Sequence, residues 1–285
     1  MLFEYTKPIV EAAERYALGG ANLIEVLPQL RKLSMEDFGL LLISMPNGQY
    51  PALSKLLPRM ASEETQIGAT GKAGVELLKQ TAAFARQLES IVLRQTGLLL
   101  QNCKILDFGV GYGRNIRSML YFTDPENLWG VDAWQSSLDL SIEAGIPAQL
   151  SRSHTMPAEL PVGDTKFDLA FAFSVFTHLS KEATLACLAA IRKCISLDGV
   201  CVITVRPIEL WNLDNKHYDL KQRMRMIEDH RNSGFAFVPL PFSVDGSYGD
   251  SSMDFAALNV PGWQFVGYDS SLLDPYQLSA ILRPA

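Results

Sequence analysis

The stretch KILDFGVGYGRNIRSML, residues 104–120, decides the fold because it joins an apolar run, a glycine-rich turn and the start of a helix. The apolar run ends beside an acidic residue, Asp107, and the helix opens with Arg114. Between them stand three alternating glycines: Gly109, Gly111 and Gly113. Glycine adopts backbone conformations closed to other residues and lets a ligand approach the main chain. The stretch therefore predicts a strand–turn–helix unit whose turn holds a ligand.

The chain after this unit alternates between short apolar runs and helical patterns. Strands are expected at 104–108, 127–134, 147–153, 167–175, 199–207, 263–270 and 276–284. Such alternation predicts right-handed βαβ units and a mainly parallel sheet. The runs LAFAFSV (169–175) and VCVITV (200–205) are apolar throughout, which is typical of strands covered on both faces.

Two segments lie outside this alternation. Residues 1–100 carry apolar positions at three- and four-residue spacing, so we expect a helical N-terminal extension or cap, with Gly97 ending its last helix. Residues 101–285 form the second expected domain, and within it 208–255 breaks the pattern over too long a stretch for a turn. We expect this insertion to cover a substrate. Six of its aromatic residues are candidates to line a pocket: Trp211, Tyr218, Phe235, Phe237, Phe242 and Tyr248.

Composition and patterning argue against several classes of partner. The 285 residues carry a net charge of −6 and no long basic stretch, which disfavours a nucleic-acid partner. No apolar run has the length of a membrane-spanning helix, and the N-terminal stretch lacks the pattern of a signal peptide. The four cysteines have no metal-binding spacing and read as buried thiols of a reducing compartment. We therefore expect a cytoplasmic protein without a metal site.

The identity of the ligand follows from what the glycine turn lacks. A dinucleotide fingerprint requires glycine at the position of Arg114, and a phosphate-binding P-loop requires Lys-Ser/Thr after its glycines. The carboxylate of Asp107 disfavours a pyrophosphate beside the loop. It suits a cationic ligand, such as the ammonium and sulfonium groups of S-adenosylmethionine.

ILDFGVGYGR (105–114) resembles the first motif of the class I S-adenosylmethionine-dependent methyltransferases. FDLAFAFSVFTHLS (167–180) resembles the fourth-strand motif of that family, and LDGVCVITV (197–205) its fifth strand. Upstream, residues 62–84 resemble a segment of a bacterial subgroup with a helical N-terminal extension, in which a Thr-Gly turn lies against the cofactor. The resemblance implies a Rossmann-like α/β fold whose seven-stranded sheet is mostly parallel, with an antiparallel last strand.

The resemblance also implies a set of cofactor-binding residues. They are Thr70, Gly71, Asp107, Gly109, Gly111, Gly113, Arg114, Asp132, Ala133, Trp134 and Ser174. Asp132, at the end of the second expected strand, would bind the ribose hydroxyls. Trp134 would either stack on adenine or pack, and Arg114 would contact the ligand carboxylate or a nearby acid. The third expected strand lacks the family's adenine-binding residue, so backbone groups of 151–153 are the candidates there.

His178 is the candidate catalytic residue, because it follows the fourth expected strand, near the expected position of the methyl group. A neutral imidazole there would accept a proton from the methyl acceptor, or would instead fix the loop or bind the cofactor. The sequence thus predicts a methyltransferase acting on a small-molecule or glycan-type O or N acceptor. Two alternatives remain open: a non-catalytic S-adenosylmethionine-binding protein and a nucleotide-dependent oxidoreductase. The oligomeric state is not predicted.

Overall fold

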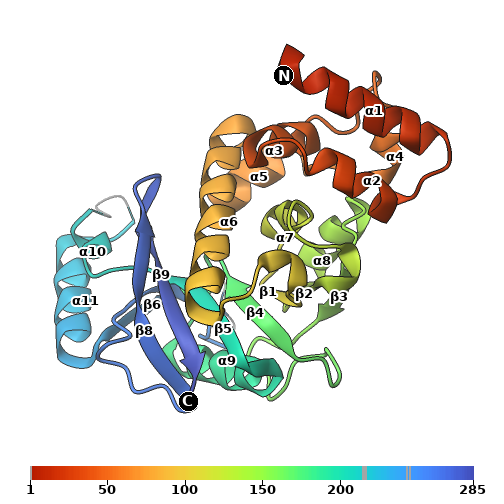
Figure 1. The fold of residues 1–285 in the computed structure, drawn as a ribbon. Coiled ribbons are helices and arrows are strands. Elements are labelled where there is room, and N and C mark those ends of the chain that lie inside the picture. Colours follow the sequence, from red (N-terminus) through yellow and green to blue (C-terminus); the bar gives the residue numbers. More distant parts are fainter. Residues whose placement is uncertain (1, 214–216, 242, 244) are drawn as a thin grey trace. The chain divides into compact units, whose positions relative to one another are not determined.

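The computed structural model describes residues 2–213, 217–241, 243 and 245–285 (Figure 1). Its contacts divide the chain into two compact units. The first unit comprises Met1–Leu93, Leu98–Cys103 and Val110–Arg152, and the second comprises Arg94–Gly97, Lys104–Gly109 and Ser153–Ala285. Within the described residues, no helix combines the length and apolar character needed to cross a membrane.

Seven strands form one sheet in the order β3-β2-β1-β4-β5-β9-β8. The strands are β1 (Ile105–Phe108), β2 (Leu128–Asp132), β3 (Gln149–Arg152), β4 (Phe167–Ala172), β5 (Ile195–Val205), β8 (Trp263–Ser271) and β9 (Asp274–Pro284). β4 pairs in parallel with β1 and β5, and β2 pairs in parallel with β3, whereas β9 runs antiparallel to both β5 and β8. This arrangement confirms the predicted mostly parallel sheet with an antiparallel last strand.

The N-terminal hundred residues are helical, as predicted. Their helices are η1 (Glu4–Thr6), α1 (Lys7–Leu18), α2 (Leu23–Leu30), α3 (Met35–Ile43), α4 (Leu53–Leu56), α5 (Glu63–Thr70), α6 (Gly74–Thr96) and η2 (Leu100–Asn102). Polar side chains cap several of them: Asn22, Ser34 and Ser62 each accept a hydrogen bond from the backbone N–H three residues later. α6 ends directly before Gly97, as the sequence indicates.

Further helices of the first unit follow the glycine turn and β2. They are α7 (Arg114–Met119), η3 (Pro125–Asn127) and α8 (Gln135–Glu143). Arg31, from the turn after α2, donates to the carbonyls of Leu120 and Thr123 and pairs with Asp124 at 2.8 Å. These bonds fasten the N-terminal helices to the turn after α7 within this unit.

Arg117 of α7 is a buried charged residue of the first unit, with 2% of its surface exposed. Its guanidinium donates to the carbonyls of Arg59, Gly113 and Tyr112, at 2.6, 3.0 and 3.2 Å. Burial lowers the pKa of Arg117 to about 10, which leaves the group charged at neutral pH. One side chain therefore holds three carbonyls of the first unit.

The second unit contains α9 (Lys181–Cys194) and the insertion. The insertion folds into α10 (Leu210–Leu213), α11 (Leu220–Ser233) and an antiparallel pair, β6 (Phe235–Pro239) and β7 (Gly249–Met253). It has an apolar cluster of its own, made of Trp211, Tyr218, Met226, Ile227 and Ala236. The sequence predicted a long insertion here but none of these elements.

All four cysteines are buried thiols, as predicted. Burial raises the pKa of Cys187 to about 12 and that of Cys194 to about 11. Thiols with such pKa values carry almost no thiolate at neutral pH and behave as small apolar side chains.

Arg117→Ala should lower the free energy of unfolding by about 3 kcal/mol or more, because three carbonyls lose their donor inside the protein. The matched control is Arg94→Ala, which removes an exposed guanidinium paired with Asp269 at 2.8 Å and should cost less than about 1 kcal/mol. Urea unfolding followed by circular dichroism measures both values. Equal losses in the two variants would contradict the proposed role of Arg117.

Candidate active site

The glycine turn between β1 and α7 uses a backbone conformation that strongly favours glycine. Gly109, Gly111 and Gly113 have φ angles of 81°, 57° and 80°, all in the left-handed region. A Cβ on Gly113 would lie 2.5 Å from Cγ1 of Ile146, and one on Gly109 would overlap Cγ2 of Val175. A Cβ on Gly111 would meet nothing within 4 Å. Gly111 therefore presents its backbone to open space, whereas the two outer glycines are packed.

Asp132, the last residue of β2, holds this turn. One carboxylate oxygen accepts the N–H of Gly111 and the other accepts the N–H of Trp134, both at 2.9 Å. The hydroxyl of Ser141 in α8 donates to the carbonyl of Gly111 at 2.8 Å, so both backbone groups of this glycine are fixed. Burial raises the pKa of Asp132, and hydrogen bonds from the backbone N–H groups of Trp134, Gly111 and Ala133 oppose that rise.

The other residues predicted in the first unit have distinct surroundings. Arg114 donates to the carboxamide of Gln80 in α6. Trp134 is 46% exposed, and the carbonyl of Ala133 accepts a hydrogen bond from Arg152 at 3.3 Å. The structure thus brings Gly111, Asp132 and Trp134 into direct contact and ties Arg114 to the helical N-terminal segment.

Thr70 and Gly71 form the predicted turn at the end of α5. Gly71 has a φ of 72°, and its N–H donates to the carbonyl of Ile67 at 2.7 Å. The hydroxyl of Thr70 donates to the carbonyls of Gln66 and Lys72. These bonds account for the shape of the turn, and its contact with a cofactor stays a prediction.

In the second unit, Asp107 is the penultimate residue of β1, a strand buried along its whole length, and has 1% of its surface exposed. Asp168, at the start of β4, accepts the N–H of Lys104 at 2.9 Å. Asp168 therefore supports the sheet near the start of β1, whereas Asp107 lies at the opposite end of that strand, where the glycine turn begins.

Ser174 follows β4 and has a φ of 60°. Among the described residues other than glycine, no second residue has a positive φ. A serine in this region carries about 1–2 kcal/mol of strain and needs neighbours that hold it. Its N–H donates to Oγ1 of Thr204 in β5 at 2.7 Å, and Nε2 of Gln277 in β9 donates to its hydroxyl at 3.1 Å.

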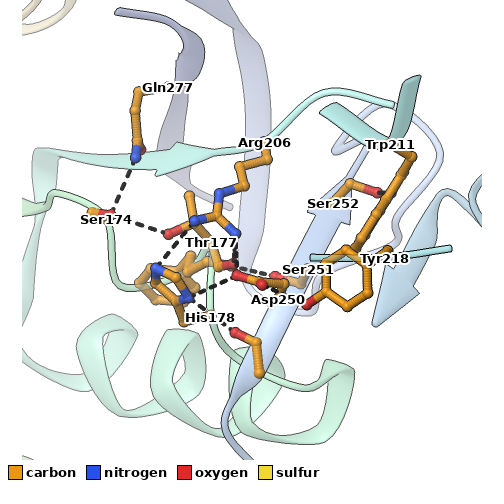
Figure 2. A network of polar contacts seen from close by, with 12 residues as sticks. Ser174, Thr177, His178, Arg206, Trp211, Tyr218, Asp250, Ser251, Ser252 and Gln277 are labelled. Carbon is orange, nitrogen blue, oxygen red and sulfur yellow. Dashed lines mark hydrogen bonds and ion pairs between the residues drawn. The ribbon is translucent and has the colours of Figure 1, made fainter. Parts of the chain in front are cut away.

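His178 lies in a network with Arg206 and Asp250 (Figure 2). Its Nδ1 lies 2.9 Å from the carbonyl of Gly249 and 3.2 Å from the carboxylate of Asp250. Because a carbonyl only accepts, Nδ1 carries the hydrogen. Nε2 then accepts from Arg206 at 3.2 Å, and the ring stacks on Tyr248. Both ring nitrogens of His178 are thus engaged, and its role as a general base stays a prediction.

Asp250, in β7, is the centre of this network. It pairs with Arg206 at 2.5 Å and accepts the hydroxyl of Tyr218 at 2.6 Å. Burial alone would raise the pKa of Asp250, but hydrogen bonds from His178 and Tyr218 and the charge of Arg206 together hold it well below its usual range. The carboxylate is therefore ionised at neutral pH.

Backbone hydrogen bonds run beside these side chains and join β7 to the loop after β4. The N–H groups of Gly249 and Ser251 donate to the carbonyls of His178 and Thr177, at 2.8 and 3.0 Å. The hydroxyl of Ser251 donates to the carbonyl of Phe176 at 2.9 Å. These hydrogen bonds hold β7 of the insertion beside the loop after β4.

Sequence reasoning missed Arg206, Asp250 and Gln277. Arg206 carries a usable signal, because it directly follows the buried strand β5, at the end where α/β sheets bind ligands. Asp250 and Gln277 have no such signal in the sequence, because their roles depend on contacts with distant segments.

The aromatic residues of the insertion have different surroundings, and their role in lining a pocket stays a prediction. Trp211 and Tyr218 pack in the insertion's own cluster, and Phe235 is buried. Tyr248 stacks on His178, and Phe242 lies outside the described residues. Within the described part of the chain, no group of three or more His, Cys, Asp or Glu residues has the arrangement of a metal site.

Comparison with known proteins supports the class of fold. Residues 106–203 match the family described as a methyltransferase domain. None of the curated proteins matches the chain. The solved structure of DesVI from Streptomyces venezuelae superposes with a TM-score of 0.50 over 79% of this chain and 100% of its own, at 14% identity. The CcbJ methyltransferase from Streptomyces caelestis gives 0.46 over 70% and 95%, at 16% identity. At these levels of sequence identity, the similarity shows a shared fold only.

The matched segment begins in β1, spans the glycine turn and ends in β5, and the sheet has the seven strands and the antiparallel last strand that the resemblance implies. Residues 106–203 therefore form a methyltransferase domain, and the sheet around them has the fold that the resemblance to the class I S-adenosylmethionine-dependent methyltransferases implies. The predicted family, fold class and type of enzyme are confirmed.

Alanine substitutions in the glycine turn should distinguish a glycine that is packed against a side chain from one that faces open space. Gly111→Ala should cost about 1–2 kcal/mol of unfolding free energy for its positive φ alone. Gly109→Ala should cost a further 1–3 kcal/mol, roughly, because its methyl group overlaps the stiff side chain of Val175. Urea unfolding measures both values. A larger loss in Gly111→Ala than in Gly109→Ala would show that the packing of the turn differs from this account.

Asp250→Asn should destabilise the protein at pH 7 by about 2–4 kcal/mol, because the partly buried guanidinium of Arg206 loses its counter-charge. Tyr218→Phe, which removes a single hydrogen bond to the same carboxylate, should cost about 1 kcal/mol.

The difference between wild type and Asp250→Asn should also depend on pH. A carboxylate with a lowered pKa stabilises the fold above its unfolded pKa of about 4, and the effect declines as pH falls toward the folded pKa. Urea unfolding from pH 7 to pH 3 should therefore show a constant difference down to about pH 5 and a narrowing one below about pH 4. A difference that widens in acid would contradict the ionised state of Asp250.

Proposed function

We propose that the chain binds S-adenosylmethionine at the glycine turn and Asp132 and transfers the methyl group to a small O or N acceptor in the cytoplasm. The observation that carries this proposal is the backbone of Gly111. Asp132 and Ser141 fix its N–H and carbonyl, and its Cα faces open space. A ligand reaches such a rigid backbone surface without reorganising it.

The hydrogen-bond acceptors of Asp132 fit the cofactor. A carboxylate has about four acceptor sites, and the N–H groups of Gly111 and Trp134 take two of them. The remaining lone pairs suit the two hydroxyls of a ribose. Trp134, nearly half exposed beside Asp132, offers an aromatic face for the adenine.

The remaining contacts of the cofactor are proposed on the resemblance of the motifs. They involve Thr70, Gly71, Asp107, Gly109, Gly113, Arg114, Ala133 and Ser174. The hydrogen bond between Arg114 and Gln80 supports the part of this proposal that includes the N-terminal helical segment, because α6 reaches the first residue after the glycine turn.

When bound, S-adenosylmethionine supplies a methyl group on a positively charged sulfur. The chain then has to hold the acceptor in line with that methyl group, at about 3–3.5 Å, and to exclude water. A catalytic base is required for a weakly acidic hydroxyl and is dispensable for a neutral amine. His178 serves as that base only where Arg206 releases Nε2.

We also propose the division of the chain into a helical extension, 1–100, and a methyltransferase domain, 101–285, whose insertion at 208–255 covers the acceptor. The hydrogen bonds of Gly249 and Ser251 to the loop after β4 support a fixed cover. Buried, protonated thiols are compatible with a cytoplasmic location. A small acceptor fits the acidic balance of the chain better than a nucleic acid does.

Isothermal titration should give micromolar Kd values for S-adenosylmethionine and S-adenosylhomocysteine, and no binding of NAD. Asp132→Ala should weaken both ligands at least tenfold, whereas Asp139→Ala, an exposed carboxylate on α8, should leave them within twofold. Because burial raises the pKa of Asp132, affinity should fall in acid at a higher pH than an ordinary aspartate would give.

Two outcomes would contradict the proposal. Binding of NAD alone would favour the oxidoreductase alternative, which Arg114 in place of the third fingerprint glycine disfavours. Tight binding of S-adenosylmethionine without methylation of any acceptor would favour the non-catalytic alternative.

A further inference from the structure

Three elements hold Ser174 in its strained conformation. Ser174 itself follows β4, Thr204 on β5 accepts its N–H at 2.7 Å, and Gln277 on β9 donates to its hydroxyl at 3.1 Å (Figure 2). Thr204 is fully buried. Backbone strain that the surroundings maintain in this way points to a function for the residue that bears it.

Gln277 contributes only half of its carboxamide to this arrangement. Nε2 is bonded to Ser174, whereas Oε1 is shielded from solvent and has no hydrogen-bond partner. Buried side-chain oxygens in native proteins nearly always have a partner, so this oxygen calls for a donor from outside the chain. The terminal torsion of glutamine is broad, which lets the carboxamide turn toward a ligand.

The polar groups around Ser174 are electrically neutral. They are the hydroxyls of Thr177 and Thr204 and the carboxamide of Gln277. The nearest charges in this network compensate one another, because Arg206 pairs with Asp250 and also donates to the carbonyl of Thr177. A carboxylate or phosphate would find no uncompensated cation among these groups.

We propose that Gln277 and Ser174 recognise the methyl acceptor, and that the group they recognise is an uncharged hydroxyl or amine. The inference rests on the proposed methyltransferase function and names the acceptor class of the same site. The O–H or N–H of the acceptor donates to Oε1 of Gln277, and the hydroxyl of Ser174 donates to one lone pair of the acceptor atom. A hydroxyl acceptor keeps its second lone pair for the methyl group. An amine acceptor instead donates a second N–H to the Ser174 hydroxyl and keeps its single lone pair for the methyl group.

The transfer conserves atoms and charge. A bond forms between the methyl carbon and the acceptor oxygen or nitrogen, and the bond between that carbon and sulfur breaks. The sulfonium becomes a neutral thioether, and the acceptor's proton leaves to water. Neither Gln277 nor Ser174 changes its protonation state.

The test uses radiolabelled S-adenosylmethionine and five probes: methyl glucoside, catechol and aniline as uncharged acceptors, and benzoate and glucose 6-phosphate as anionic ones. Wild type should methylate at least one uncharged probe and neither anionic one. Gln277→Ala should lower kcat/KM for that probe at least tenfold and leave the Kd of S-adenosylhomocysteine within twofold. Gln264→Ala, an exposed glutamine on the neighbouring strand β8, is the matched control and should behave as wild type.

Ser174→Gly supplies a second readout that a merely structural role would not produce. Glycine accepts a φ of 60°, so the variant should keep or raise the melting temperature while the transfer rate falls at least tenfold. A lower melting temperature with unchanged transfer would overturn the proposal.

The remaining outcomes distinguish a failure of the proposed methyltransferase function from a failure of the proposed acceptor class. Wild type that binds neither S-adenosylmethionine nor its product would refute the proposed function itself. Wild type that binds both, but methylates only the anionic probes or none of the five, would refute the acceptor class alone. Unchanged kcat/KM in Gln277→Ala would refute the role of that residue.

Discussion

The carboxylate of Asp132 is the contact on which the glycine turn depends. It accepts two backbone N–H groups, one from Gly111 before α7 and one from Trp134 before α8. A turn with three successive left-handed glycines has many alternative conformations, and glycine loses more entropy on ordering than any other residue. One buried carboxylate, with Ser141 on the opposite backbone group, selects a single conformation. In the proposed function, the same carboxylate would also bind the ribose hydroxyls of the cofactor.

Asp250 has a comparable organising role in the second unit. It brings Arg206, Tyr218 and His178 together, and the strand that carries it pairs with the loop after β4. The insertion therefore does not depend on its apolar cluster alone for its position against that loop. Burying a carboxylate and a guanidinium is favourable only when both have further hydrogen bonds, and here each has them. Such a network fixes one geometry, as a site that must orient an acceptor requires.

The strands of the sheet could be predicted from the sequence because burial on both faces leaves continuous apolar runs, as in β4 and β5. The glycine turn and Asp132 could be predicted because their spacing is local. α11 escaped prediction since its sequence is largely polar, with Met226 and Ile227 among its few buried positions. β6 and β7 escaped because a short two-stranded pair relies on contacts with residues far away in the chain. Gln277 and Ser174 are 103 positions apart in sequence, so no local pattern links them.

The geometry of His178 changes what the loop after β4 contributes to catalysis. With Nδ1 donating to Gly249 and Nε2 accepting from Arg206, the imidazole is neutral and its basic nitrogen is covered. A proton-accepting role requires the guanidinium to move away from Nε2, although Asp250 and the carbonyl of Thr177 both hold it. Positioning of the acceptor by neutral groups requires no such movement. A neutral amine that binds to Ser174 and Gln277 would react by alignment with the methyl group and lose its proton after transfer, whereas a weakly acidic hydroxyl would still need a base. The strain at Ser174 is then the structural cost of holding a hydroxyl where the acceptor needs it.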